Sequence, residues 1–111
     1  MDTRSKIAGP GTVAAVKPGL RVVSGFFDPL LRAHVEELER LSGGGGIAVV
    51  IVEPEEPLLP ARARAELVAA LRCVEAVYLD GVGAPEADAR LDAGHARIRA
   101  EFIRHVRERQ S

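Results

Sequence analysis

The sequence has few of the residues that build disulfides, metal clusters or aromatic binding surfaces. Cys73 is the only cysteine, there is no tryptophan, and aromatic residues make up 4% of the 111 residues. A single cysteine excludes an internal disulfide and argues against a cysteine-based metal cluster within one chain. We therefore expect a protein of the reducing cytoplasm with no metal site formed by its own residues.

The chain also lacks an excess of charge of one sign and a long hydrophobic run. Lys and Arg number 15 and Asp and Glu number 16, which leaves a formal net charge of −1. Such a balance gives no global field to attract nucleic acid or an anionic membrane, so any recognition of phosphate must be local. Within residues 1–19 the apolar run Val13–Val16 is too short for a signal segment or a bilayer crossing. These absences predict no nucleic-acid partner and no membrane partner.

What the sequence does contain is enough apolar material for one folded domain. Hydrophobic residues make up 47% and charged residues 28%, which is typical of a globular protein with an aliphatic core. A chain of this length falls within the usual size of a single domain. We expect an N-terminal arm over residues 1–19 and a single α/β domain over residues 20–111.

Apolar runs and helical spacings alternate along this domain. The β-branched runs predict three strands, at Leu20–Ser24, Ile47–Val52 and Val74–Leu79. Between them, apolar residues at helical spacing predict crossover helices at 30–41 and 61–72, and a longer helical pattern runs from Pro85 to Arg109. This order predicts a three-layer, Rossmann-like parallel sheet with a βαβαβ core and a long C-terminal helix.

The first expected strand leads into a glycine turn and a helix that carries a histidine. Gly25 would let a ligand approach the backbone, and the following helix start presents free amides and the positive end of a dipole. Asp28 followed by Pro29 is a favourable helix start, with Asp28 as the cap. His34 lies on the apolar face of that helix, where it either packs against the sheet or contacts a ligand. The arrangement predicts a place where phosphate fits.

Two segments in the right order give this chain a resemblance to a known family. Gly25-Phe26-Phe27-Asp28 followed by His34 resembles the pattern Gly-x-Phe-Asp-x-x-His-x-Gly-His of the cytidylyltransferase-like nucleotidyltransferases, and the helix around Arg64 is similar to one in their heptose and glycerol phosphate members. The resemblance implies attack of a phosphate or alcohol acceptor on a nucleoside triphosphate such as CTP or ATP, with magnesium, and release of pyrophosphate. It implies a catalytic role for His34 and nucleotide contacts by Gly25, Phe26, Phe27, Asp28, His34 and Arg64.

The chain departs from the family pattern at positions that carry chemistry. Leu31 stands in place of the first signature histidine and Ala33 in place of the glycine. The loss of one preorganised donor typically costs about 10²–10³ in rate. Residues 53–57 are acidic where the family has a lysine, and residues 82–110 contain no Ser or Thr for a phosphate-binding turn. The sequence thus predicts a degenerate member with a weak nucleotide or phosphate site and little or no turnover.

Two other functions stay open. An active nucleotidyltransferase would use His34 together with groups from a partner subunit, whereas a non-catalytic interaction protein would use the last helix to form a homodimer or to dock. The apolar seam of that helix contains Leu91, Ile98 and Phe102. Taken without the resemblance, Arg64 is typical of a solvated helix residue. His95 and His105 lack metal-binding spacing and are expected at the edge of the core.

Overall fold

A computed structural model describes residues 6–8, 20–80 and 84–110 of the chain. Most of the predicted arm at residues 1–19 therefore lies outside the described residues. The described elements are β1 (Arg21–Gly25), α1 (Arg32–Ser42), β2 (Ile47–Ile51), α2 (Ala61–Ala69), β3 (Val74–Leu79), β4 (Ala89–Arg90) and α3 (Asp92–Gln110).

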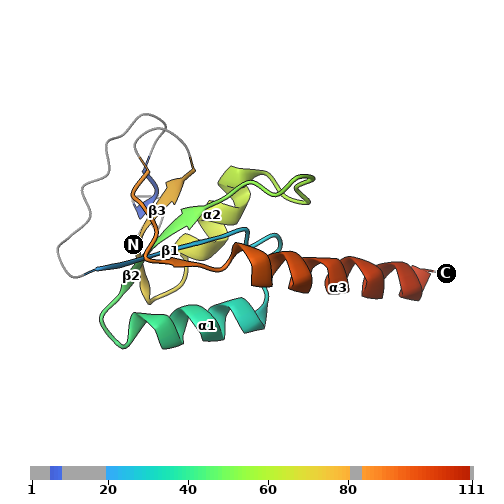
Figure 1. The fold of residues 1–111 in the computed structure, drawn as a ribbon, viewed down its shortest axis with the longest axis horizontal. Helices are drawn as coiled ribbons and strands as arrows, with labels where there is room; N and C mark the ends of the chain where they lie inside the picture. Colours follow the sequence, from blue (N-terminus) through green and yellow to red (C-terminus); the bar gives the residue numbers. More distant parts are fainter. Residues whose placement is uncertain (1–5, 9–19, 81–83, 111) are drawn as a thin grey trace.

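The four strands form one parallel sheet in the order β3-β2-β1-β4 (Figure 1). The continuous apolar run of β2 is buried at all five positions, as expected for a central strand with neighbours on both edges and layers on both faces. The predicted Rossmann-like α/β fold with a long C-terminal helix is confirmed. Because the chain returns from β3 to the far side of β1, the order of strands reverses at β1, where ligands bind in many folds of this kind.

The start of the last helix differs from the prediction. The helix begins at Asp92 rather than at Pro85, and the residues before it contribute the short strand β4. Asp88 fixes this segment to β1, because its N–H donates to the carbonyl of Val22 (2.8 Å) and its carboxylate accepts the Val22 N–H (2.8 Å). The Leu91 N–H then donates to the Ser24 carbonyl (2.8 Å). A two-residue strand is too short to produce a sequence pattern of its own.

The two faces of the sheet are covered differently. Helices α1 and α2 pack on one face through a core that includes Leu38, Ala65 and Val68. The opposite face carries a smaller cluster of Val22, Ala48, Val50 and Tyr78, on which Ala8, Leu20, Ala84 and Ala87 pack from segments outside the helices. The described cover of this second face is therefore non-helical.

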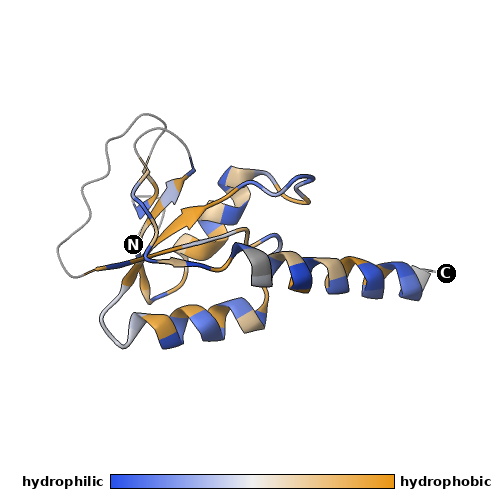
Figure 2. Cartoon of the chain, in the orientation of Figure 1, coloured by the Kyte–Doolittle hydropathy of each residue, from blue (hydrophilic) through white to orange (hydrophobic). Residues whose placement is uncertain are grey.

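Helix α3 begins beside β1 and then runs away from the sheet, so that its C-terminal turns extend beyond the other elements (Figure 1). The central strand β2 is hydrophobic throughout, whereas α3 alternates between hydrophilic and hydrophobic residues along its length (Figure 2). Among the helices of the described residues, none combines the length and hydropathy that a bilayer crossing requires.

Candidate functional site

The structure brings the six residues implied by the resemblance to one edge of the sheet. Gly25 ends β1, and Phe26, Phe27 and Asp28 form the turn that follows it. His34 comes from the first turn of α1 and Arg64 from α2. Except for Phe26, which is partly exposed, all are buried, and Phe27 and Arg64 are fully inaccessible. The six positions therefore lie around one turn, and five of them are buried within the protein.

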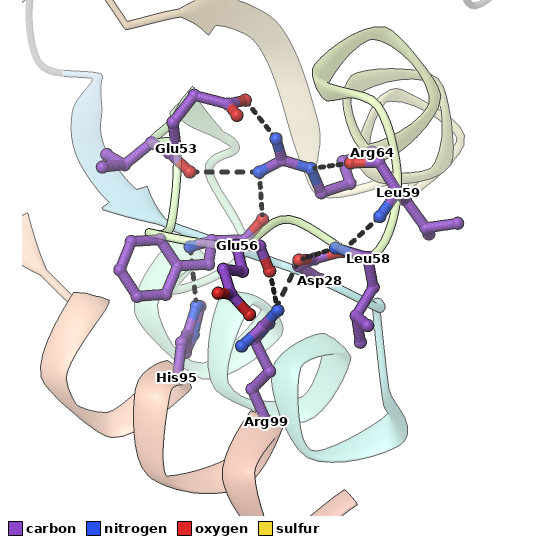
Figure 3. A network of polar contacts seen from close by, with 10 residues as sticks. Asp28, Glu53, Glu56, Leu58, Leu59, Arg64, His95 and Arg99 are labelled. Atoms are coloured by element: carbon purple, nitrogen blue, oxygen red, sulfur yellow. Dashed lines mark hydrogen bonds and ion pairs between the residues drawn. The ribbon is translucent and has the colours of Figure 1, made fainter. Parts of the chain in front are cut away.

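Asp28 is a buried acceptor within the protein. Its carboxylate accepts the backbone N–H groups of Leu58 (2.7 Å) and Leu59 (2.8 Å), and the Nε of Arg99 donates to Oδ2 (3.2 Å) (Figure 3). The predicted role of Asp28 as a helix cap is wrong, because α1 begins at Arg32 with Leu31 as its N-cap. The carboxylate instead holds the loop between β2 and α2 and the first part of α3 to the turn after β1.

Arg64 joins the same elements from the other side. Its guanidinium donates to the carbonyl oxygens of Leu59, Phe26 and Val52, each at 3.0 Å (Figure 3). The remaining nitrogen, Nη2, pairs with the Glu53 carboxylate. The interpretation of Arg64 as a solvated helix residue is therefore wrong. Because a planar guanidinium offers five donors, it can bind three separate backbone carbonyls and a carboxylate at once.

His34 has a structural partner that explains its buried position. Its Nδ1 accepts the backbone N–H of Leu31 (2.9 Å), which is the N-cap of α1. The side chain thus satisfies one of the free amides at the helix start, as the third helical residue does in a capping box. The Phe27 ring contacts it edge-on, with ring centroids 5.7 Å apart. His34 is 3% exposed.

His95 is the site residue that the sequence did not identify. It comes from the first turns of α3, is 2% exposed, and its Nδ1 accepts the Phe26 N–H (3.2 Å). A Cβ at Gly25 would lie 2.4 Å from the His95 ring, so the missing side chain of Gly25 is what lets this imidazole approach β1. The sequence predicted that Gly25 lets a ligand approach the backbone, whereas in the structure the group that approaches it is the chain's own His95.

The two imidazoles stack beside each other, with ring centroids 4.3 Å apart and planes tilted by 56°. Since each Nδ1 accepts a backbone N–H, the neutral form of each ring carries its proton on Nε2. Both Nε2 atoms are buried, and neither has a hydrogen-bond partner among residues 6–8, 20–80 and 84–110. The nearest carboxylate oxygen to His95 Nε2, from Glu37, lies 3.6 Å away, which is beyond hydrogen-bond distance.

Burial sets the protonation of the pair. It lowers the pKa of His34 from 6.5 to about 4, with a further lowering by His95 and an opposing effect of Glu37. Burial likewise lowers the pKa of His95 to about 4. Near neutral pH both rings are therefore uncharged, and each keeps one hydrogen-bond donor that the protein does not use.

The turn between β1 and α1 is also strained. Phe27 adopts a φ of 47°, in the left-handed region that residues other than glycine rarely enter. Its ring lies against both histidines, with its centroid 4.5 Å from that of His95. Backbone strain of this kind persists where surrounding packing enforces it, and it is frequent at functional sites.

A separate cavity of about 240 Å³ opens on the opposite side of β1, at the carboxyl end of the sheet. Its lining includes Ser24, Asp80, Arg90 and Asp92, and Ser24 Oγ donates to Asp92 Oδ1 (3.2 Å). None of the six predicted site residues lines this cavity. Within residues 6–8, 20–80 and 84–110, no three His, Cys, Asp or Glu side chains are grouped to hold a metal ion.

Comparison of the chain with protein-family models and with curated proteins finds no match. The family resemblance therefore stands on the residues of the turn and of α2 alone.

Proposed function

We propose that the chain is a cytidylyltransferase-like domain that binds a nucleotide or another phosphorylated molecule weakly at the turn after β1, with little or no transferase turnover. The observation that carries the proposal is the pair of buried imidazoles, His34 and His95, whose Nε2–H donors find no partner in the described part of the chain. They lie beside Gly25, at the carboxyl end of β1 and the start of α1.

Unpartnered buried donors favour a ligand with acceptor oxygens. A buried polar group without a partner typically costs about 1–3 kcal/mol, and most such groups in native proteins are satisfied. The two rings lie side by side, with centroids 4.3 Å apart, and in this proposal both contribute a donor to one phosphoryl group. Their Nδ1 atoms are held by backbone N–H groups, which fixes both rings with Nε2 as the donor. In this proposal the two rings are held ready to donate to an anion.

The same geometry explains why binding would be weak. Both Nε2 atoms are inaccessible, and the His95 imidazole covers the face of Gly25. A ligand must therefore displace the start of α3 outward, and the free energy of this opening reduces the apparent affinity. Asp28 and Arg64 are fully engaged with the backbone, so in this proposal they position the turn, while the histidines contact the ligand.

The described residues do not fit a protein-held magnesium ion. The Asp28 carboxylate already accepts two amides and the Arg99 guanidinium, and no three suitable side chains are grouped in the described part of the chain. Magnesium would arrive bound to the triphosphate of a nucleotide, and no step of the proposal depends on it.

Calorimetric titration with CTP and with ATP, each with magnesium, tests the proposal. We expect weak binding of at least one nucleotide by the wild type and a loss of at least tenfold in affinity in His34→Ala and in His95→Ala. His105→Ala is the matched control, because His105 lies on the same helix but is exposed. If neither nucleotide nor inorganic pyrophosphate produces heat, the ligand role fails and a non-catalytic interaction role remains.

An active nucleotidyltransferase is the second candidate. The observation that favours it is His95, which adds an imidazole next to His34 although Leu31 replaces the first signature histidine. Two donors at the phosphates could stabilise the charge that develops during transfer. Pyrophosphate release in the presence of phosphorylated acceptors would distinguish this candidate. The activity must fall by about 10²-fold or more in His34→Ala, as expected for one lost donor.

A further inference from the structure

The outer half of α3 presents an apolar face without a partner among the described residues. His95 and Arg99 attach the first turns of α3 to the domain. The same helical face continues outward through Phe102 and Val106, because steps of three and four residues return to one side of a helix. Neither residue belongs to a core cluster, and Val106 is 37% exposed. Figure 1 shows these turns extending away from the sheet.

The loop between β2 and α2 lies beside the base of this face. Asp28 Oδ2 accepts both the Leu58 N–H and the Nε of Arg99, and Arg99 Nη2 also donates to the Glu56 carbonyl. Leu58 itself is 47% exposed. The loop therefore lies against the first half of α3 through Arg99 and leaves the Leu58 side chain exposed there. The adjoining side of the helix carries a shallow groove of about 540 Å³, lined by Arg99, Ala100, Ile103, Arg104, Arg107 and Glu108.

The two segments carry opposite charges. From residue 97 onward α3 contains five arginines and two glutamates, whereas residues 53–57 contain three glutamates and no basic residue. The chain as a whole has a formal net charge of −1, so this is a separation of charge within one molecule. A surface with an apolar centre and separate positive and negative ends is complementary to a second copy of itself under twofold symmetry.

We infer that α3 and the loop at residues 53–58 form a twofold interface with a second copy of this chain. The outer half of α3 from one protomer lies antiparallel to that of its partner, with Phe102, Ile103 and Val106 at the centre. The arginines near its end then meet the glutamates of the other protomer's loop. An unrelated acidic partner would be attracted to the arginines of the helix but repelled by the glutamates of the loop. A second copy of the chain therefore fits this surface better.

The size of the surface predicts a weak dimer. Twelve residues of helix span about 18 Å, which gives an interface at the lower end of those that form specific complexes. We expect a dissociation constant in roughly the micromolar range. Arg99 would not oppose association, because the buried Asp28 carboxylate already pairs with it.

Sedimentation velocity over a concentration series tests the interface in the full chain. The wild type should shift from monomer to dimer, and Val106→Glu should remain monomeric at concentrations at which the wild type is a dimer. Leu67→Glu is the matched control, because Leu67 is 46% exposed on α2 and lies outside the proposed surface. Circular dichroism must show that both variants keep the wild-type fold, as expected for exposed positions.

Charge reversal gives the more specific test. Glu55→Arg with Glu56→Arg should abolish the dimer, as should Arg107→Glu with Arg109→Glu. An equimolar mixture of these two double variants should dimerise again, because both loop–helix contacts regain opposite charges. A wild type that stays monomeric throughout, or a mixture that does not re-associate, overturns the inference. Binding of a monomeric chain to an anionic vesicle or an oligonucleotide through Arg107 and Arg109 would assign the helix to that partner instead.

Discussion

Two buried polar clusters lie at the same edge of the sheet, and they differ in how completely their hydrogen bonds are made. In the Asp28–Arg64 cluster the described carboxylate and guanidinium atoms are engaged with backbone groups, Glu53 or Arg99. In the histidine pair each ring has one satisfied nitrogen and one buried nitrogen to which no described residue bonds. A completed network stabilises the fold, whereas an incomplete one keeps a capacity to bind.

Replacement of Arg64 by methionine should produce the largest loss of stability. Three carbonyl oxygens would lose their donor inside the protein, and we expect the free energy of unfolding to fall by about 3–5 kcal/mol. Urea denaturation followed by circular dichroism measures this change. Arg62→Met is the control, because Arg62 is half exposed and its described ion pair is with Glu66 in the same helix. Equal stability of the two variants would contradict the structural role of Arg64.

The histidine pair should make stability depend on pH. Both pKa values are lowered in the folded state, from 6.5 to about 4, so between these values the unfolded chain binds more protons. The contribution of the two uncharged, buried imidazoles to the free energy of unfolding is fully present above pH 6.5. It is lost as the pH falls to about 4. A difference of this size corresponds to on the order of 3 kcal/mol for one fully affected imidazole.

Denaturation at several pH values between 4 and 7 tests this dependence. The double variant His34→Gln with His95→Gln should show a flatter profile than the wild type over this interval, since glutamine does not titrate. His105→Gln is the matched control for the loss of an imidazole, because His105 is exposed on the same helix as His95. A wild-type profile that is already flat would mean that the two rings are not buried in solution.

Alanine at Gly25 tests whether His95 occupies the space that the sequence suggested for a ligand. The new Cβ would lie 2.4 Å from His95 Cε1 and 2.9 Å from Phe27 Cε2, and overpacking of this kind typically costs about 1–3 kcal/mol. His95→Ala in the same chain should relieve part of this loss, so the two changes should not be additive. Gly94→Ala is the control, because a Cβ there meets nothing within 4 Å.

Of the substitutions considered for stability, Glu53→Gln should change the free energy of unfolding least. The Glu53 side chain is 54% exposed, although its partner Arg64 is fully buried. Exposed ion pairs contribute about 0–1 kcal/mol, and the bonds from Arg64 to the three carbonyls remain in place. Thermal denaturation of this variant and of Arg64→Met separates the two contributions. A loss as large as that of Arg64→Met would mean that the ion pair, rather than the backbone bonds, holds the cluster.

The sequence predicted the central strands and helices because their signals are local. Ile47–Ile51 is a continuous β-branched and apolar run, and it forms β2 within a residue of the predicted end. The burial of Arg64 could not be predicted, since it depends on carbonyls of Phe26 and Val52 that tertiary folding brings to it. In its own helix, near Arg62 and Glu66, it resembles a surface residue.

The role of His95 could not be predicted from the sequence either, because its contacts also form only through tertiary folding. Its hydrogen bond to Phe26 spans 69 positions in the sequence, and no periodicity connects the two residues. The one available signal was Gly25, which marks a close approach without showing what approaches. Asp28 was assigned to the wrong partner because a following proline is typical of a helix start, whereas its carboxylate binds amides about 30 residues further along the chain.

Asp28 and Arg64 bind backbone groups of other residues, and this affects which substitutions related domains could tolerate. Their partners at positions 26, 52, 58 and 59 are amides and carbonyls, which every residue type except proline provides in full. Side chains at those four positions can therefore change without breaking the cluster. Distant relatives are expected to keep an aspartate and an arginine about 36 residues apart while the sequence around them drifts. That pair would identify them better than overall similarity.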